Sequence, residues 1–296
     1  MLDTGTLPGM TGTAEFESCR PLLLGLAYRL LGSMWDAEDV VQEAWLRWEG
    51  TDRDVVREPR AFLITVVSRL ALDQLRSARV KREAYPGPWL PEPVATAEAG
   101  PLDTAELRDT VAFATLHLME RLSPPERAVF VLREAFELPY DEIAEIVGAS
   151  VANARQMHHR ASVRLAEGRD RFRPSSREHE ELLTRFIAAA GGGDLSALTD
   201  LLHEDVVMWS DGGGRIRAAL RPIEGRDKVR RFLEGLMARY EYGAVSVVEV
   251  NGHPAIWMRI GPDDQLVVLD WHEGRIRGLY GVLNPDKLAR VRAASL

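Results

Sequence analysis

The sequence has very little cysteine and no long apolar run. Its one cysteine, Cys19, cannot form a disulfide within the chain, and no cluster of cysteines and histidines has zinc-ligand spacing. No uncharged apolar run approaches the roughly 18 residues of a membrane span. The first residues also lack the basic and apolar regions of a signal peptide. We therefore expect a cytoplasmic protein without a metal, a cofactor or a membrane partner.

Positive charge is scarce as well, because 37 Lys and Arg face 45 Asp and Glu, for a net charge of −8. Taken as an average, this charge argues against a nucleic-acid partner. Its distribution argues the opposite. Residues 57–82 contain seven Lys or Arg against two Asp or Glu, and residues 151–176 contain six against two. Two basic blocks in an otherwise acidic chain point to local contacts with phosphate groups.

The 296 residues are enough for two or three domains, and the 46% apolar and 28% charged residues are typical of folded chains. Residues 14–85 have apolar side chains at helical spacing throughout. Asp36 is the expected N-cap of one helix, and another should begin at Pro59 and run past Arg79. The apolar stripe of this second helix consists of Ile64, Val67, Ala71, Leu75 and Ala78.

Five prolines within residues 86–104 exclude a helix and predict an extended linker. Helical spacing returns over residues 105–173. The remaining domain, residues 178–292, has a different pattern, with short β-type runs separated by turn signals. We expect an α+β domain with a curved antiparallel sheet.

The α+β domain should contain three helices, at about residues 178–190, 194–203 and 225–239, the second capped by Asp194. Its predicted strands are Val206–Ser210, Val245–Val250, Ala255–Ile260, Leu266–Trp271 and Arg275–Val282.

The first basic block lies on the helix that begins at Pro59. Arg69, Arg76 and Arg79 share one face of it, interrupted by Asp73. Such a face is either a solvated charged surface or a surface that follows a phosphate backbone. On the preceding helix, one face carries two carboxylate side chains and one amide side chain. They either dock a basic protein surface or are simply exposed to solvent. This group consists of Asp39, Gln42 and Glu43.

The second basic block begins within residues 140–161, which fit a helix-turn-helix. Gly148 supplies the left-handed residue that ends the first helix, and Ser150 caps the second. The side chains expected to face inward are Ile143, Val147, Ala154 and Met157. Those expected to face outward are Asn153, Arg155, Gln156, His159 and Arg160. Asn, Arg and Gln read base edges in the major groove, although an ordinary helical hairpin has the same spacing.

Residues 14–172 resemble the bacterial RNA polymerase sigma factors of the extracytoplasmic-function group. The resemblance lies in residues 36–48, 59–79 and 122–133, followed by the helix-turn-helix. It implies a multidomain fold with two all-α domains, namely a region 2 helical bundle over 14–85 and region 4 over 105–173. It also implies that Asp39, Gln42 and Glu43 bind core RNA polymerase. Promoter DNA would be bound at the −10 element by Arg69, Asp73, Arg76 and Arg79, and at the −35 element by the outward side chains of the helix-turn-helix.

Three further motifs resemble the signatures of the subgroup known as ECF41, whose members carry a fused C-terminal domain similar to the SnoaL polyketide cyclases, an NTF2-like α+β cone. The first is Trp89, Leu90, Pro91, Glu92 and Pro93. The second is Asp211, Gly212, Gly213, Gly214 and Arg215, with Arg where Lys is usual. The third is Asn284, Pro285, Asp286, Lys287 and Leu288. In that subgroup the domain is a built-in regulator, and we expect the stiff linker motif to dock on the other two.

The resemblance implies a sigma factor, monomeric when free and not an enzyme, that is regulated by its own C-terminal domain. In one alternative this domain senses a small ligand or retains enzymatic activity, with a pocket built from Trp209, Trp257, Trp271, His203, Asp211, Asp270 and Arg217. In a third class, the chain is a dimeric helix-turn-helix repressor, which would require a palindromic operator.

Overall fold

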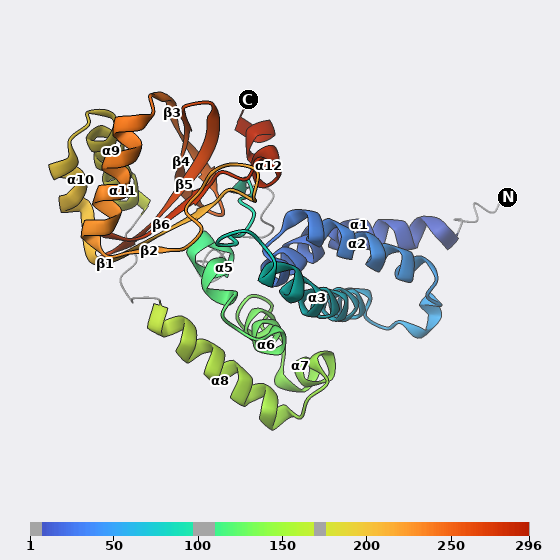
Figure 1. Cartoon of the computed structure of the whole chain (residues 1–296). Helices are drawn as coiled ribbons and strands as arrows, with labels where there is room; N and C mark the ends of the chain where they lie inside the picture. The colour runs from blue at the N-terminus through green and yellow to red at the C-terminus, as the bar shows by residue number, and fades with distance from the viewer. Residues whose placement is uncertain (1–7, 97–109, 169–175, 296) are drawn as a thin grey trace. The chain divides into compact units, whose positions relative to one another are not determined.

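The computed structural model of the chain describes residues 8–96, 110–168 and 176–295 (Figure 1). These residues form two compact units. The first takes in residues 1–80, 97–111 and 119–164, and the second takes in residues 81–96, 112–118 and 165–296. The predicted fold class, all-α parts followed by an α+β domain, is confirmed. Among the described helices, none is both long and apolar enough to cross a membrane.

The first unit begins with three long helices, α1 (Pro8–Leu31), α2 (Met34–Glu49) and α3 (Pro59–Glu83), with the short 3-10 helix η1 (Arg53–Val55) before α3. The predicted stripe of α3 is buried as far as Leu75, and the side chain of Ala78 lies outside the described residues. The N-cap of α2 is not Asp36, because the helix begins earlier. Ser33 caps it and accepts a hydrogen bond from the Asp36 backbone N–H at 3.3 Å, which places Asp36 in the first turn.

The second part of this unit contains α6 (Pro124–Glu134), α7 (Tyr140–Val147) and α8 (Val151–Gly168). Gly148 ends α7 with a φ of 70°, and the Ser150 hydroxyl accepts from the Asn153 backbone N–H at 3.2 Å. Both features confirm the predicted turn between the two helices. The inward face of α7 differs from the prediction. Ile146 is buried and Val147 is only half-buried, because the short helix packs through the residue three positions after Ile143.

The second unit contains a six-stranded sheet in the order β2-β1-β6-β5-β4-β3. The strands are β1 (Leu202–Asp211), β2 (Ile223–Glu224), β3 (Tyr242–Val250), β4 (His253–Ile260), β5 (Asp263–His272) and β6 (Arg275–Val282). The helices of the unit are α5 (Phe113–Met119), α9 (Ser176–Gly191), α10 (Leu195–Leu201), α11 (Arg226–Arg239) and α12 (Pro285–Ser295). The predicted cap Asp194 accepts from the Ala197 N–H at 2.9 Å. The sheet is mixed rather than wholly antiparallel, since β1 and β6 are parallel.

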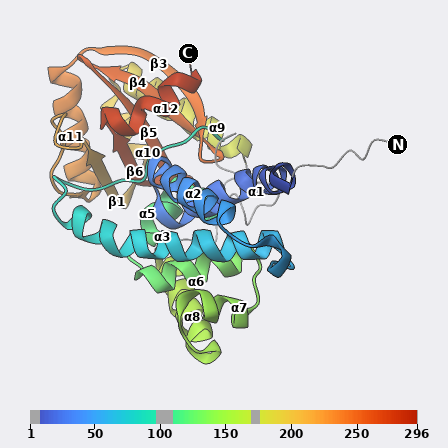
Figure 2. The same cartoon turned by 90° about the vertical axis from the view of Figure 1, so that its right-hand side faces the viewer.

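Both faces of this sheet are covered (Figures 1 and 2). Helices α9, α10 and α11 pack on one face. On the other face lie Leu90 of the linker, α5 and α12. Because neither face is open to water, residues 265–269 of β5 are all buried instead of alternating. In β1, Met208 and Trp209 belong to the cores on opposite faces, so the strand takes part in both.

Candidate functional site

The outward face of α8 is the candidate surface for duplex DNA. Asn153, Arg155, Gln156 and His159 are exposed, as predicted. Arg160 differs, because its Nε donates to Glu126 Oε1 at 3.1 Å while Arg164 donates to Oε2 of the same carboxylate at 2.9 Å. Arg160 therefore joins α8 to α6, and the other four side chains are left to face a ligand.

Glu126 holds this junction together. Burial alone would raise the pKa of its carboxyl, but hydrogen bonds from the Ser123 side chain and backbone and from Arg160 hold the pKa below its usual range, with help from the charge of Arg164. The carboxylate is 4% exposed and also forms the capping box of α6 with Ser123. It fixes how α8 packs on α6.

The basic face of α3 is partly engaged within the first unit. Arg69 donates to the Glu145 backbone carbonyl on α7 at 3.3 Å. Arg76 forms an exposed ion pair with Asp73 at 3.0 Å. The Arg79 side chain lies outside the described residues. The described part of this face is thus less positive than the three arginines suggest, because Asp73 neutralises one of them.

The exposed face of α2 carries more than the predicted polar group. Asp39, Gln42 and Glu43 are exposed, and Glu43 pairs with Arg47 at 3.3 Å. Trp35 and Leu46, 55% and 54% exposed, lie on the same face, since positions 35, 39, 42 and 46 follow a helical period. Sequence reasoning missed these two residues, although their phase with Asp39 and Gln42 was visible. Exposed apolar side chains beside polar ones are typical of a protein-binding surface.

Two buried arginines join α1 and α6. Arg127, 2% exposed, donates from Nε and Nη2 to the Arg29 backbone carbonyl at 3.2 and 3.1 Å, and also pairs with Glu120. Arg29, 1% exposed, donates to the Gly25 carbonyl and to Thr110 Oγ1. Burial lowers the pKa of Arg29 to about 10. Cations buried to this degree need every one of these partners, so the junction between α1 and α6 is specific.

The three motifs of the second unit meet at Asp211, whose side chain is fully buried. Its Oδ1 accepts from the Tyr85 hydroxyl at 2.7 Å, and its Oδ2 accepts from the Leu90 backbone N–H at 2.9 Å and from Lys287 Nζ at 2.7 Å. Lys287 also donates to the Leu90 carbonyl. We call the group consisting of Tyr85, Leu90, Asp211, Asn284 and Lys287 the Asp211 cluster.

Side chains around the Asp211 cluster extend the contact along the linker. The Trp89 ring lies 3.7 Å from the Arg82 guanidinium and 4.1 Å from Lys287 Nζ, both measured to the ring centroid. Glu92, 1% exposed, pairs with Arg290 of α12 at 3.4 Å. Further along, Asn251 and Val94 exchange hydrogen bonds of 3.0 and 3.3 Å. The described linker is therefore held from Trp89 to Val94.

Tyr85 is a member of the cluster that sequence reasoning missed. Besides donating to Asp211, its hydroxyl accepts from Asn284 Nδ2 at 2.9 Å. Burial and the bond to Asp211 raise the pKa of Tyr85, so the hydroxyl stays protonated and can donate. Tyr85 precedes the prolines by a single residue, and nothing in one sequence marks it as a partner of Asp211.

The glycines of the second motif are required by space and by backbone conformation. Gly213 has a φ of 62°, and a Cβ there would lie 2.4 Å from Asn284 Nδ2. Gly214 has a φ of 70°, and a Cβ there would lie 2.8 Å from Pro86. The turn thereby lets the third motif and the linker approach the backbone closely. Arg215 follows the turn and pairs with Asp286 at 3.0 Å, an exposed bond.

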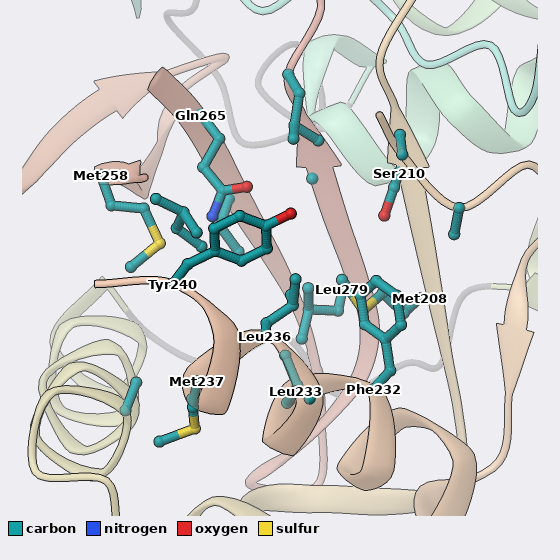
Figure 3. A pocket seen from close by; sticks show the side chains of 18 of the residues that line it. Met208, Ser210, Phe232, Leu233, Leu236, Met237, Tyr240, Met258, Gln265 and Leu279 are labelled. Carbon is teal, nitrogen blue, oxygen red and sulfur yellow. The ribbon is translucent and has the colours of Figure 1, made fainter. Parts of the chain in front are cut away.

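A cavity of about 420 Å³ lies on the opposite face of the sheet, between β1, β5, β6 and helix α11 (Figure 3). Apart from Arg217, none of the seven pocket candidates from the sequence lines it. Asp211 binds the linker instead, and Trp209 stacks on Tyr280 across the sheet, with 4.9 Å between ring centroids. Among the described residues, no three His, Cys, Asp or Glu side chains are placed to share a metal ion.

Three family models match the chain. Residues 16–80 match sigma-70 region 2, residues 112–165 match sigma-70 region 4, and residues 183–278 match the SnoaL-like domain. The two units of the structure thus hold three parts with known relatives.

Whole-chain relatives share this order of parts. The extracytoplasmic-function RNA polymerase sigma factor SigJ of Mycobacterium tuberculosis is 40% identical over 93% of this chain and 92% of its own length. The probable sigma factor SigI of the same species is 31% identical over 95% of this chain and 96% of its own. The crystal structure of M. tuberculosis SigJ matches with a TM-score of 0.76 and 38% identity, over 94% of this chain and 98% of that one.

Proposed function

Because the chain belongs to the extracytoplasmic-function sigma factors of RNA polymerase, we propose that its SnoaL-like domain restrains it by holding the linker at the Asp211 cluster. A sigma factor of this group binds core RNA polymerase and directs it to promoters. In this proposal residues 14–85 form region 2, residues 105–173 form region 4, and residues 178–292 form the regulatory domain. The linker between the first two is residues 86–104.

One observation supports the proposal most strongly. Asp211 is completely buried, and its carboxylate accepts from Tyr85, from the Leu90 backbone N–H of the linker and from Lys287 of the third motif. The Gly213 N–H of its own turn supplies a fourth hydrogen bond. Removing one partner of a buried, hydrogen-bonded ion pair costs about 3–5 kcal/mol, because the other charge stays buried and unpaired. The cluster is therefore a strong attachment whose loss would free the linker.

The restraint has a physical reason. The −10 and −35 elements, about 25 base pairs apart, are separated by roughly 85 Å along a duplex. Regions 2 and 4 must separate to reach both, which requires the Arg29–Arg127 junction to open. An extended chain gains at most about 3.5 Å per residue, so a linker held from Trp89 to Val94 loses roughly 20 Å of reach.

We assign DNA and polymerase contacts in the same proposal. Asn153, Arg155, Gln156 and His159 would read the −35 element, with Arg160 positioning α8 through Glu126. Arg69, Asp73, Arg76 and Arg79 would contact the −10 element, once Arg69 has left the Glu145 carbonyl. Asp39, Gln42 and Glu43 would bind core polymerase together with Trp35 and Leu46.

Run-off transcription with purified core polymerase tests the restraint. Lys287→Met removes the charge that pairs with Asp211 and should raise the transcript yield several-fold. Lys228→Met, which removes an exposed lysine of the same domain, is the matched control and should leave the yield unchanged.

Two further variants leave the C-terminal domain intact, namely Tyr85→Phe, immediately before the linker, and Trp89→Ala, within it. Both should raise the transcript yield, as Lys287→Met does, and deletion of residues 284–296 should raise it too. An unchanged or lower yield in the two linker variants would contradict the restraint.

A further inference from the structure

The cavity beside α11 is lined mainly by apolar side chains, with a few polar groups among them. Most of its lining residues are apolar, mainly Leu, Met, Phe, Ile, Ala and Val, and Met208, Phe232, Leu236 and Leu279 are visible around it in Figure 3. A volume of about 420 Å³ falls within the range of roughly 300–1,000 Å³ that small-molecule sites occupy. The space is thus large enough for an apolar molecule of moderate size.

Two of the polar groups are deeply buried. Gln265 is 8% exposed and Ser210 is 4% exposed, and both side chains point into the cavity with the Tyr240 hydroxyl nearby (Figure 3). Both groups line the cavity, so an amide and a hydroxyl are placed to bond a polar atom of a ligand.

The exposed part of the cavity lining is basic. Arg217, Arg231 and Arg239 line it and are exposed, whereas Asp263 is the only acidic residue among the lining side chains of the described chain. The three guanidinium groups make the exposed part of the lining positively charged, whereas most of the lining is apolar. This arrangement fits an amphipathic anion whose acidic group stays beside the exposed arginines.

From these observations we propose that the cavity binds an apolar carboxylic acid, and that binding strengthens the docking of the linker. The second half of this inference rests on the proposed function of the Asp211 cluster. It deepens that function by naming a ligand class for the regulatory domain.

The cavity and the cluster share three short segments. Ser210 lines the cavity, and the next residue is Asp211. Leu283 lines the cavity, and its backbone N–H donates to the Asp211 carbonyl at 2.8 Å. The turn that follows Asp211 lines the cavity through residues 216–219.

The same turn touches the linker. A Cβ at Gly214 would lie 2.8 Å from Pro86, and a Cβ at Gly87 would lie 3.6 Å from the Leu220 Cα. The cavity is formed while the linker is docked, so a ligand that packs against residues 216–219 favours the docked arrangement. By linkage, docking and binding must strengthen each other by the same factor.

Decanoate is the probe, with decan-1-ol as its uncharged counterpart, and calorimetry on the full chain measures the affinity. Decanoate should bind at least ten-fold more tightly than decan-1-ol. No binding of decanoate, or equal binding of the two, would overturn the assigned ligand class.

Gly235→Leu tests the location. Gly235 lines the cavity on α11, and a Cβ there meets no other atom within 4 Å, so a leucine at this position changes the cavity lining without a clash. Gly191→Leu is the matched control, because a Cβ there also meets open space and the residue does not line the cavity. Decanoate affinity should fall at least ten-fold in Gly235→Leu and remain in Gly191→Leu. Equal affinity in both variants would place the site elsewhere.

Transcription separates this inference from the proposed function. Decanoate should lower the run-off yield of the wild type and of Gly191→Leu, and it should have no effect on Gly235→Leu. Lys287→Met should bind decanoate more weakly than the wild type. If Lys287→Met raises transcription but decanoate does not bind, the inference fails and the proposed function stands. If decanoate binds but Lys287→Met leaves transcription unchanged, the proposed function fails, and the coupling fails with it.

Discussion

At the scale of single residues, the docked linker of the second unit depends on one buried carboxylate, that of Asp211. Along the described residues 85–94, two buried carboxylates take part in the docking of the linker. One is Glu92 of the linker itself, and the other is Asp211 of β1, which accepts from Tyr85 and Leu90. The three motifs were identified in the sequence through their resemblance to the ECF41 signatures. The pairing of Asp211 with Tyr85 and Lys287 could not be predicted, because these partners lie 126 and 76 residues from Asp211 along the chain.

Gly213 provides a test of the close approach between the second and third motifs. Gly213→Ala should lower the free energy of unfolding of the second unit by more than Gly274→Ala does. Both glycines have positive φ, 62° and 75°, so each alanine bears a backbone cost of about 1–2 kcal/mol. At Gly274 a Cβ meets open space, whereas at Gly213 it meets Asn284. Urea denaturation of the two variants measures the difference, and equal losses would show that Asn284 yields without cost.

His179 makes the stability of the second unit sensitive to acid. Burial, with a smaller effect from the charge of His253 on β4, lowers the pKa of His179 from 6.5 to about 4. Between these two values the unfolded chain binds the additional proton, so stability falls as the pH falls from about 6.5 to about 4. The expected loss is about 3 kcal/mol.

His179→Phe keeps a ring and removes the titration. Urea denaturation at pH ~7.5 and ~4.5 should show a smaller acid loss in this variant than in the wild type. His203→Phe is the control, because its side chain is 28% exposed. An acid loss in His179→Phe as large as that of the wild type would contradict the assignment.

At the scale of elements, helical periodicity predicted α2, α3, α7, α8, α9 and α11, because each buries one apolar stripe. Strand β2 has two residues and therefore no period to detect. The parallel pairing of β1 with β6 depends on a contact between strands that are far apart in the chain. Helix α12 could have been predicted, since Asn284 followed by Pro285 is a helix-start signal, and Asn284 Oδ1 does accept from the Asp286 N–H at 3.1 Å.

Helix α2 offers a prediction about polymerase binding. Trp35→Ala should weaken binding to core RNA polymerase by roughly 30-fold, because a truncated aromatic anchor commonly costs about 2 kcal/mol. Val55→Ala is the matched control, since Val55 is an exposed apolar residue, 72% accessible, on η1. Fluorescence anisotropy with purified core measures both affinities. Equal affinities of the two variants for core polymerase would show that Trp35 does not contact it, which would contradict the predicted α2 interface.

At the scale of the whole molecule, charge distribution is a better guide to the partner than net charge. The −8 total conceals two basic blocks, residues 57–82 and 151–176, which overlap the matches to sigma-70 regions 2 and 4 over residues 57–80 and 151–165. The structure refines this picture, because Arg76, Arg160 and Arg164 already pair with carboxylates. Part of the positive charge therefore builds the DNA-binding units, and the rest is available to DNA.

The most direct test of the restraint is the distance between regions 2 and 4 in the free protein. Cys19 is the chain's single cysteine, so Val163→Cys, at an exposed position on α8, supplies the second site for a pair of spin labels. Pulsed electron resonance should give one short-distance population for the otherwise wild-type chain and for Lys228→Met. Lys287→Met and Trp89→Ala should shift it to longer and broader distances. Identical distance distributions in all four proteins would contradict the claim that the docked linker holds the two regions together.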